Sequence, residues 1–323
     1  MRTYVIRRVL LLIPTFLLLT VLVFLSVRFL PGDAVDVMMA RVAAMEGASG
    51  TADFDRERVV RMLGLDVPAH VQYVRWLGGI FLRGTLGDSL FGGYTVEEKI
   101  IDRLPITVEL GVLAILIGVV IAVPVGIYSA VRQDTAADYA GRSIAIIGLA
   151  TPNFWLGTLV LTFPAIWWAW APPLRMVAFV DDPLRNLGHM FIPSLILGTY
   201  LSATVMRMTR TMMLEVLRQD YIRTAWAKGL KERVIILRHV IKNALIPVVT
   251  LVGLQLPILV GGSVIMENMF ALPGLGRLML EALSARDYPV VSGINLFFAT
   301  AVMTINLLID ILYGYLDPRV QYR

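Results

Sequence analysis

Two acidic residues lie within long apolar stretches of this 323-residue chain, where a carboxylate could take part in proton transfer through a membrane. Glu109 follows Pro105 near one end of its stretch, and Asp310 lies about two helical turns before Asp317 and Arg319. Both positions favour anchoring at the membrane surface or pairing with another helix. A proton-driven carrier would show several acids near the midplane, and this sequence places none there.

Residues for other kinds of chemistry are scattered or missing. The three histidines, His70, His189 and His239, lie far apart and form no H-E-x-x-H metal motif. The chain has no cysteine, which excludes disulfides, zinc-thiolate sites and thiol catalysis. It has neither a G-x-x-x-x-G-K-[ST] phosphate loop nor a G-x-G-x-x-G motif. We therefore expect no catalytic, cofactor-binding or metal-binding residues, and no ATP bound through a phosphate loop.

The composition is that of an integral membrane protein. Hydrophobic residues make up 57% and charged residues 16% of the chain, with a mean hydropathy of +0.73, whereas soluble domains are about 45–50% apolar and about 25% charged. The apolar segments are about twenty residues long, as α-helical spans require. The sequence predicts an all-α, polytopic bundle of six transmembrane helices, at about 9–29, 106–130, 143–170, 190–206, 245–266 and 291–313.

Basic residues in the short connections predict that both termini are cytoplasmic, because cytoplasmic loops are enriched in Lys and Arg. They occur at Arg2, Arg7, Arg8, Arg132, Arg142, Arg207, Arg210, the residues after Gly229, Arg319 and Arg323. Segments 171–189 and 267–290 carry no such excess, which suits the outer side. Membrane topology thus explains the pI near 9.5, and no nucleic-acid partner is expected. The first apolar run is too long for a signal-peptide core, so we expect a membrane anchor.

Topology divides the chain into three expected parts: residues 1–30 with the first span, an extracytoplasmic segment at 31–104, and a five-helix core at 105–323. Within the outer segment, apolar residues recur at helical spacing over 55–63 and 70–82. At 95–104, apolar residues line one face and charges the other, which predicts a helix along the membrane surface before the second span.

A basic block at 207–242 holds nine Lys and Arg residues against three Asp and Glu. It predicts an amphipathic helix at about 213–229. The apolar stripe of this helix consists of Leu214, Leu217, Tyr221, Ala225 and Gly229. Gly229 suits the left-handed position that ends a helix, and Lys228 suits the negative helix end. The alternatives are a helix lying on anionic lipid and a helix that docks on a partner; Glu215 and Asp220 interrupt the basic face and favour the partner.

The basic block resembles the cytoplasmic coupling loop ("EAA" loop) of ABC importer permeases, over residues 221–229 and 238–247. Four further parts of the chain resemble, more narrowly, the dipeptide/oligopeptide/nickel permease family. These are 4–33 with its Leu30-Pro-Gly-Asp33, 103–110, 267–276 with 286–289, and 313–319. The resemblance covers nearly the whole chain.

This resemblance implies a permease with type I ABC importer architecture in the prokaryotic cytoplasmic (inner) membrane. Its implied partners are a second, homologous permease in a heterodimer, two ABC ATPase subunits that bind ATP and Mg, an extracytoplasmic solute-binding protein and membrane lipid. Segments 31–104 and 267–290 would dock the binding protein. The residues expected to couple to the ATPase are Asp220, Tyr221, Arg223, Thr224, Ala225, Lys228 and Gly229. The candidates for the substrate path are Gln255 and Asn295, which are polar residues within spans.

Two departures leave open which polar residues contact the ATPase. Thr224-Ala-Trp226 stands where the general motif has Glu-Ala-Ala, and Leu245-Ile-Pro247 replaces a later Leu-Pro element. The cargo is also open among dipeptides, oligopeptides, nickel chelates and other small solutes. The alternative function is a self-sufficient, ion-coupled secondary carrier or channel. A membrane-embedded enzyme is a third option, for which the chain has no paired acid/base or metal constellation.

Overall fold

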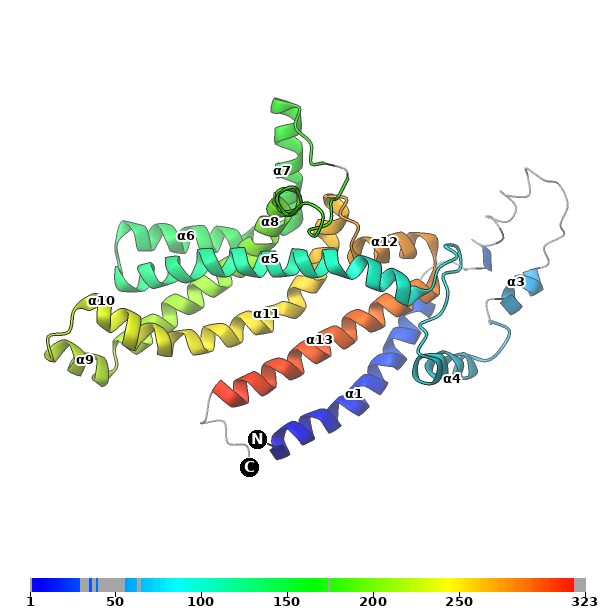
Figure 1. Ribbon diagram of the computed structural model, residues 1–323, viewed down its shortest axis with the longest axis horizontal. Helices are drawn as coiled ribbons and strands as arrows, with labels where there is room; N and C mark the ends of the chain where they lie inside the picture. Colours follow the sequence, from blue (N-terminus) through cyan, green and yellow to red (C-terminus); the bar gives the residue numbers. More distant parts are fainter. Residues whose placement is uncertain are drawn as a thin grey trace. The chain divides into compact units, whose positions relative to one another are not determined.

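A computed structural model describes residues 2–29, 35–36, 39, 56–62, 65–173 and 175–316, and these form helices joined by loops (Figure 1). The earlier elements are α1 (Arg2–Arg28), α3 (Arg56–Met62), α4 (Ala69–Gly78), the π-helical η1 (Gly79–Arg83), α5 (Val96–Val131), α6 (Ala136–Ala150) and α7 (Asn153–Trp168). The later ones are α8 (Pro183–Leu217), α9 (Asp220–Ala227), α10 (Glu232–Val234), the π-helical η2 (Ile235–Val240), α11 (Ile241–Met269), α12 (Leu275–Ala285) and α13 (Tyr288–Leu316).

The described residues separate into two compact units. One is drawn from Met1–Pro105 and Arg277–Met303, and the other from Ile106–Gly276 and Thr304–Arg323. The three-part division expected from the sequence was drawn from membrane topology, whereas these two units are defined by compactness. The three-part division therefore stays a prediction. The helices predicted at 55–63 and 70–82 are confirmed as α3 and as α4 with η1. The motifs at 30–33 and 317–319 lie outside the described residues.

Among the residues that the structure describes, five helical segments are long and apolar enough to cross a membrane: Ile6–Arg28, Val96–Val131, Pro183–Leu217, Glu232–Pro257 and Tyr288–Ile311. A sixth is possible by length and composition if α6 and α7 together count as one span, and these two helices meet at 95°. The all-α, polytopic prediction is confirmed, but the third span is broken where a continuous helix was expected. Thr151 is extended (φ −92°, ψ 118°) before Pro152, because a following proline disfavours the helical conformation.

The surface helix predicted at 95–104 is not a separate element, because α5 begins at Val96 and continues through Pro105. Val96 and Ile100 are buried. A Cβ on Gly293 of α13 would lie 2.4 Å from Cγ1 of Val96. Part of the apolar face of this first part of α5 is therefore covered by protein of its own unit, while Ile101 on the same stretch is 70% exposed.

Helix α8 is the centre of the second unit and contacts α11, α6 and α7. It also approaches α5 closely. A Cβ on Gly198 would lie 2.7 Å from the carbonyl oxygen of Ala114, and one on Gly126 would lie 2.8 Å from that of Met206. Small residues at such crossings let helix backbones pack together in membranes, where lipid provides little hydrophobic force between helices.

A buried carboxylate fixes the chain where α11 ends. The side chain of Glu267 is fully buried and accepts a hydrogen bond from Oγ1 of Thr107 on α5, at 2.8 Å. Oγ1 of Thr107 in turn accepts a bond from the backbone N–H of Leu275, at 2.9 Å. A Cβ on Gly274 would lie 2.4 Å from the Glu267 carboxyl group. Two motifs that lie far apart in the sequence, 103–110 and 267–276, thus meet in one hydrogen-bonded contact.

We expect Gly274→Ala to destabilise the protein by about 1–3 kcal/mol, because the added methyl group overpacks the Glu267 contact. The measurement is thermal unfolding of the purified protein in detergent. Gly261→Ala on α11 is the matched control, since a Cβ there has nothing within 4 Å. Equal unfolding temperatures for the two variants would show that the contact does not constrain this loop.

Candidate functional site

The helix expected at 213–229 is divided in two by the structure. Helix α8 continues to Leu217, and a new helix, α9, runs from Asp220 to Ala227. Gln219 between them is extended (φ −76°, ψ 148°). The apolar spacing of the sequence runs on across this break, so periodicity could not locate it. The predicted bounds were wrong, and α9 is the separate helix that the structure places within them.

Two side chains of α9 are buried inside the chain's own bundle. Ile222 is fully buried, and Ala225 is 8% exposed. Their cluster also contains Ala130 of α5, Met213 and Val216 of α8, Ile235 and Val240 of η2, and Ala244 of α11. This burial corrects the expected stripe: Ala225 faces its own chain, and its small side chain lets α9 lie close to the bundle.

The rest of the α9 surface is exposed and mixes aromatic and charged side chains. Tyr221 is 41% and Trp226 47% exposed, and Arg223, Thr224 and Lys228 are also exposed. The phenolic oxygen of Tyr221 accepts a hydrogen bond from Nδ2 of Asn243 at 3.0 Å. The sequence interpretation missed Trp226 as a surface residue. Its place where the general motif has alanine was the available signal.

Gly229 ends α9 in the left-handed conformation that the sequence predicted, with φ of 75°. Its N–H donates to the carbonyl of Trp226 at 2.9 Å, and the N–H of Leu230 donates to that of Ala225 at 3.4 Å. This pair of bonds is the Schellman arrangement, for which glycine carries no Cβ penalty. It turns the chain from α9 towards α10 and η2.

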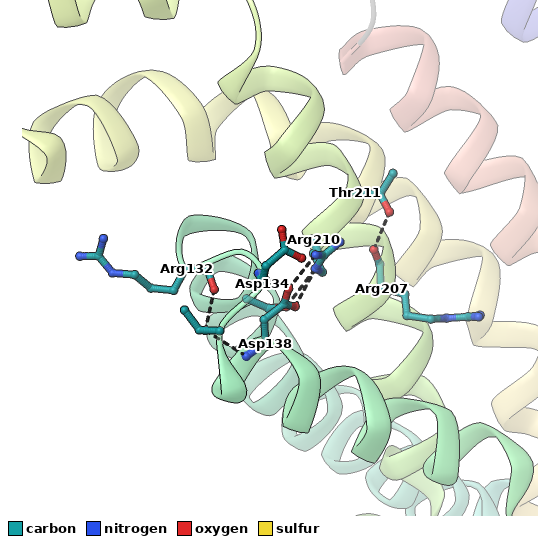
Figure 2. Close-up of polar contacts among 8 residues, drawn as sticks. Arg132, Asp134, Asp138, Arg207, Arg210 and Thr211 are labelled. Carbon is teal, nitrogen blue, oxygen red and sulfur yellow. Dashed lines mark hydrogen bonds and ion pairs between the residues drawn. The ribbon is translucent and has the colours of Figure 1, made fainter.

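A buried ion pair joins the end of α5, the start of α6 and the later part of α8 (Figure 2). Asp138 is fully buried, and Nε and Nη2 of Arg210 donate to its two carboxylate oxygens at 2.9 and 2.8 Å. Oγ of Ser129 also donates to Asp138 and accepts from Nε of Arg210 at 3.1 Å. The sequence interpretation used Arg210 for topology alone; the structure adds a bidentate contact that joins three helices.

The turn between α5 and α6 is built around the same carboxylate. Asp134 has φ of 61°, and its N–H donates to Oδ2 of Asp138 at 3.1 Å. Oγ1 of Thr135 caps α6 by accepting from the N–H of Asp138 at 3.4 Å. Arg132 forms an exposed ion pair with Glu232, 3.4 Å apart, between this turn and the chain after α9. The end of α5 thus takes part both in the apolar cluster that buries α9 and in the Asp138 contact.

The other singled-out residues belong to helices other than α9. Oε2 of Glu109 accepts from Nδ2 of Asn186 on α8 at 3.3 Å, which confirms the expected pairing with another helix. Gln255 is buried in α11, and Asn295 is half-buried in α13 of the other unit, so a substrate path through them stays a prediction. Within the described part of the chain, no three His, Cys, Asp or Glu side chains gather as a metal site.

We expect Asp138→Asn to destabilise the protein by about 3–5 kcal/mol, because it leaves Arg210 without a carboxylate partner in a buried place. Adding Arg210→Gln should cost little more, since both residues belong to one interaction. Thermal unfolding in detergent measures both effects. Asp220→Asn is the control: it removes an exposed carboxylate paired with Arg223 and should cost about 0–1 kcal/mol. A loss for Asp138→Asn no larger than that of the control would contradict the structural role.

Comparison with sequence families matches residues 122–322 to "Binding-protein-dependent transport system inner membrane component" and residues 1–111 to the N-terminal part of such membrane components. The dipeptide transport system permease protein DppB of Escherichia coli K12 is 37% identical over 346 residues. A putative peptide transport system permease of Brucella abortus is 40% identical over 322 residues, and the oligopeptide transport system permease AppB of Bacillus subtilis 38% over 325. All three comparisons cover 100% of both chains.

Solved structures support the same fold at lower identity. An amino acid ABC transporter with histidines gives a TM-score of 0.51 at 15% identity, covering 68% of this chain and 94% of that chain. The inward-facing MetNI methionine ABC transporter gives 0.51 at 18% identity, covering 68% and 96%. Together with the membrane-spanning helices, the family match establishes that this chain belongs to the inner membrane components of binding-protein-dependent transport systems, as a multi-pass permease.

Proposed function

We propose that this permease imports peptides across the inner membrane, driven by ATP hydrolysis on separate subunits. The observation that carries the ATP-coupled part is α9, a short helix with one face buried in the ends of the bundle and the other presented to solvent. The peptide cargo is supported by the relatives, which are named for dipeptide, peptide and oligopeptide transport. Their full-length coverage extends the likeness to every part of the chain.

ATP hydrolysis, translocation and peptide delivery would be carried out by different subunits. The chain has no phosphate loop, so ATP and Mg would bind to two ATPase partners, and this subunit would hydrolyse no ATP. A second, homologous permease would complete the translocation path as a heterodimer, with Gln255 and Asn295 as candidate lining residues. An extracytoplasmic solute-binding protein would deliver the peptide, with 31–104 and 267–290 as its docking segments.

Coupling of ATP hydrolysis to transport would follow from how α9 packs against the other helices. Ile222 and Ala225 pack against α5, α8, η2 and α11 at once. A push on the exposed face of α9 would therefore move the ends of several helices together. ATP-driven closure of the ATPases would favour one arrangement of the bundle over the other, because it contacts α9 differently in the two states. The Asp138–Arg210 pair would keep α5, α6 and α8 moving as one body.

We expect the double variant Arg223→Gln/Lys228→Gln to lower peptide transport and peptide-stimulated ATP hydrolysis by roughly fivefold or more. Each exposed charge pair at a protein interface contributes about 0.5–1 kcal/mol, and both variant positions lie on the exposed face of α9. The measurement is transport into vesicles that contain the complete transporter, with hydrolysis followed in parallel.

Arg175→Gln/Arg185→Gln is the matched control, because it removes the same charge from exposed residues of the segment 171–189, to which neither the ATPase nor the binding protein is assigned. It should leave both rates within about twofold, since isolated exposed charges contribute little. Equal losses in the two double variants would mean that general surface charge, and not α9, sets the rate. Peptide uptake that persists without ATP under an imposed ion gradient would overturn ATP coupling itself.

A further inference from the structure

The unit formed from Met1–Pro105 and Arg277–Met303 contains a cavity of about 650 Å³, to which the transport proposal assigns no ligand. Residues of α1, α4, the segment 86–90 and the start of α13 line it. Apolar side chains contribute to its walls, among them Phe24, Val27 and Leu90. Arg28 and Arg75 also line it, and none of its described lining residues is acidic. The cavity is thus apolar in part and positively charged.

Packing within the unit holds the cavity walls in place. Thr20 of α1 and Tyr73 of α4 share a hydrogen bond of 2.9 Å between their hydroxyl oxygens. The Phe24 ring lies 5.4 Å from that of Tyr73 and 6.0 Å from that of Trp76, centroid to centroid. On another side, the carboxylate of Asp287 accepts from the N–H of Leu90 at 3.1 Å. These contacts connect α1 to α4 and the segment 86–90 to the chain before α13.

Several hydrogen-bond donors at the cavity are available to bind an anionic ligand. The guanidinium of Arg28 lies 4.7 Å from the centre of the Phe24 ring and donates to Gln72, so its position is fixed. Among the described residues, no carboxylate forms an ion pair with Arg75, which is exposed. Nε1 of Trp76 is buried and has no hydrogen-bond partner in the described structure. A buried indole N–H ordinarily has an acceptor, so this donor is suited to a ligand oxygen.

The cavity lies at the outer end of the first membrane span. This span is Ile6–Arg28, and the cationic pair Arg7 and Arg8 marks its cytoplasmic end. Leu18 and Leu22 on the same helix are 61% and 58% exposed, as side chains facing hydrocarbon would be. Trp76 and Tyr288 line the cavity, and tryptophan and tyrosine are enriched at the head-group level of membranes.

We propose that this cavity binds the phosphate head group of an anionic phospholipid from the outer leaflet, with its acyl chains along the apolar surface of α1. Arg28, Arg75 and Nε1 of Trp76 supply the donors for the phosphate oxygens, as cationic pockets between membrane helices do for lipid head groups. A free phosphate ion would use the same donors but not the apolar surface. The inference does not rest on the peptide cargo or on α9, so the two proposals fail separately.

The test is native mass spectrometry of the full chain, purified in detergent and incubated with phosphatidylglycerol or phosphatidylcholine. We expect one phosphatidylglycerol to be retained per chain and phosphatidylcholine to be lost. Arg28→Gln/Arg75→Gln should lower phosphatidylglycerol retention by on the order of tenfold, because each cation near a membrane surface contributes about 1 kcal/mol. Trp76→Phe keeps an aromatic side chain and removes the N–H donor, and it should lower retention by a smaller factor.

Arg61→Gln/Arg83→Gln is the matched control, since it removes two exposed charges of the same unit that do not line this cavity. It should retain phosphatidylglycerol as the unchanged protein does. Equal retention by both double variants, with Trp76→Phe also unchanged, would overturn the head-group site. Equal retention of phosphatidylcholine would overturn the preference for an anion. Displacement of phosphatidylglycerol by an equal concentration of inorganic phosphate would assign the site to a free anion and overturn the lipid.

Discussion

The surface that we propose to couple to an ATPase depends on the one-sided burial of a very short helix. Eight residues are too few for a helix that stands alone, since isolated helices shorter than about 12–15 residues are marginal in water. Helix α9 persists because Ile222 and Ala225 bury against the ends of α5, α8, η2 and α11. The same burial leaves the side chains of Tyr221, Arg223, Trp226 and Lys228 exposed to solvent. The burial of Ile222 and Ala225 therefore both stabilises α9 and keeps its remaining side chains at the surface.

Two buried polar contacts fix the helices on which α9 rests. Helices in a membrane gain little hydrophobic energy from meeting one another, so small-residue packing and satisfied polar groups decide which arrangement forms. Asp138 and Arg210 join α5, α6 and α8 beside the α5–α6 turn. Glu267 and Thr107 join α5 to the end of α11. Because each buried group needs its partner, these contacts hold the helices in a defined register.

The sequence could predict what depends on neighbouring residues. Hydropathy located the membrane helices, and the glycine at 229 predicted the left-handed end of α9. The proline that follows Thr151 indicates the bend there. The sequence interpretation missed it because the apolar run continues through this position and predicts one helix. The division between α8 and α9 was not readable, because apolar residues keep helical spacing through it. Asp138 and Arg210 lie 72 residues apart, so only the packing of α6 on α8 reveals their contact.

Site-directed photo-cross-linking tests most directly whether α9 is the docking surface for an ATPase. The chain has no native cysteine, so Ala227→Cys provides one exposed thiol on α9 for a benzophenone label. Ser284→Cys on α12, in the segment assigned to the outer side, is the control. We expect an adduct with an ATPase subunit from position 227, and none from position 284, in the assembled transporter. An active transporter that gives no ATPase adduct from position 227 would contradict α9 as the docking surface.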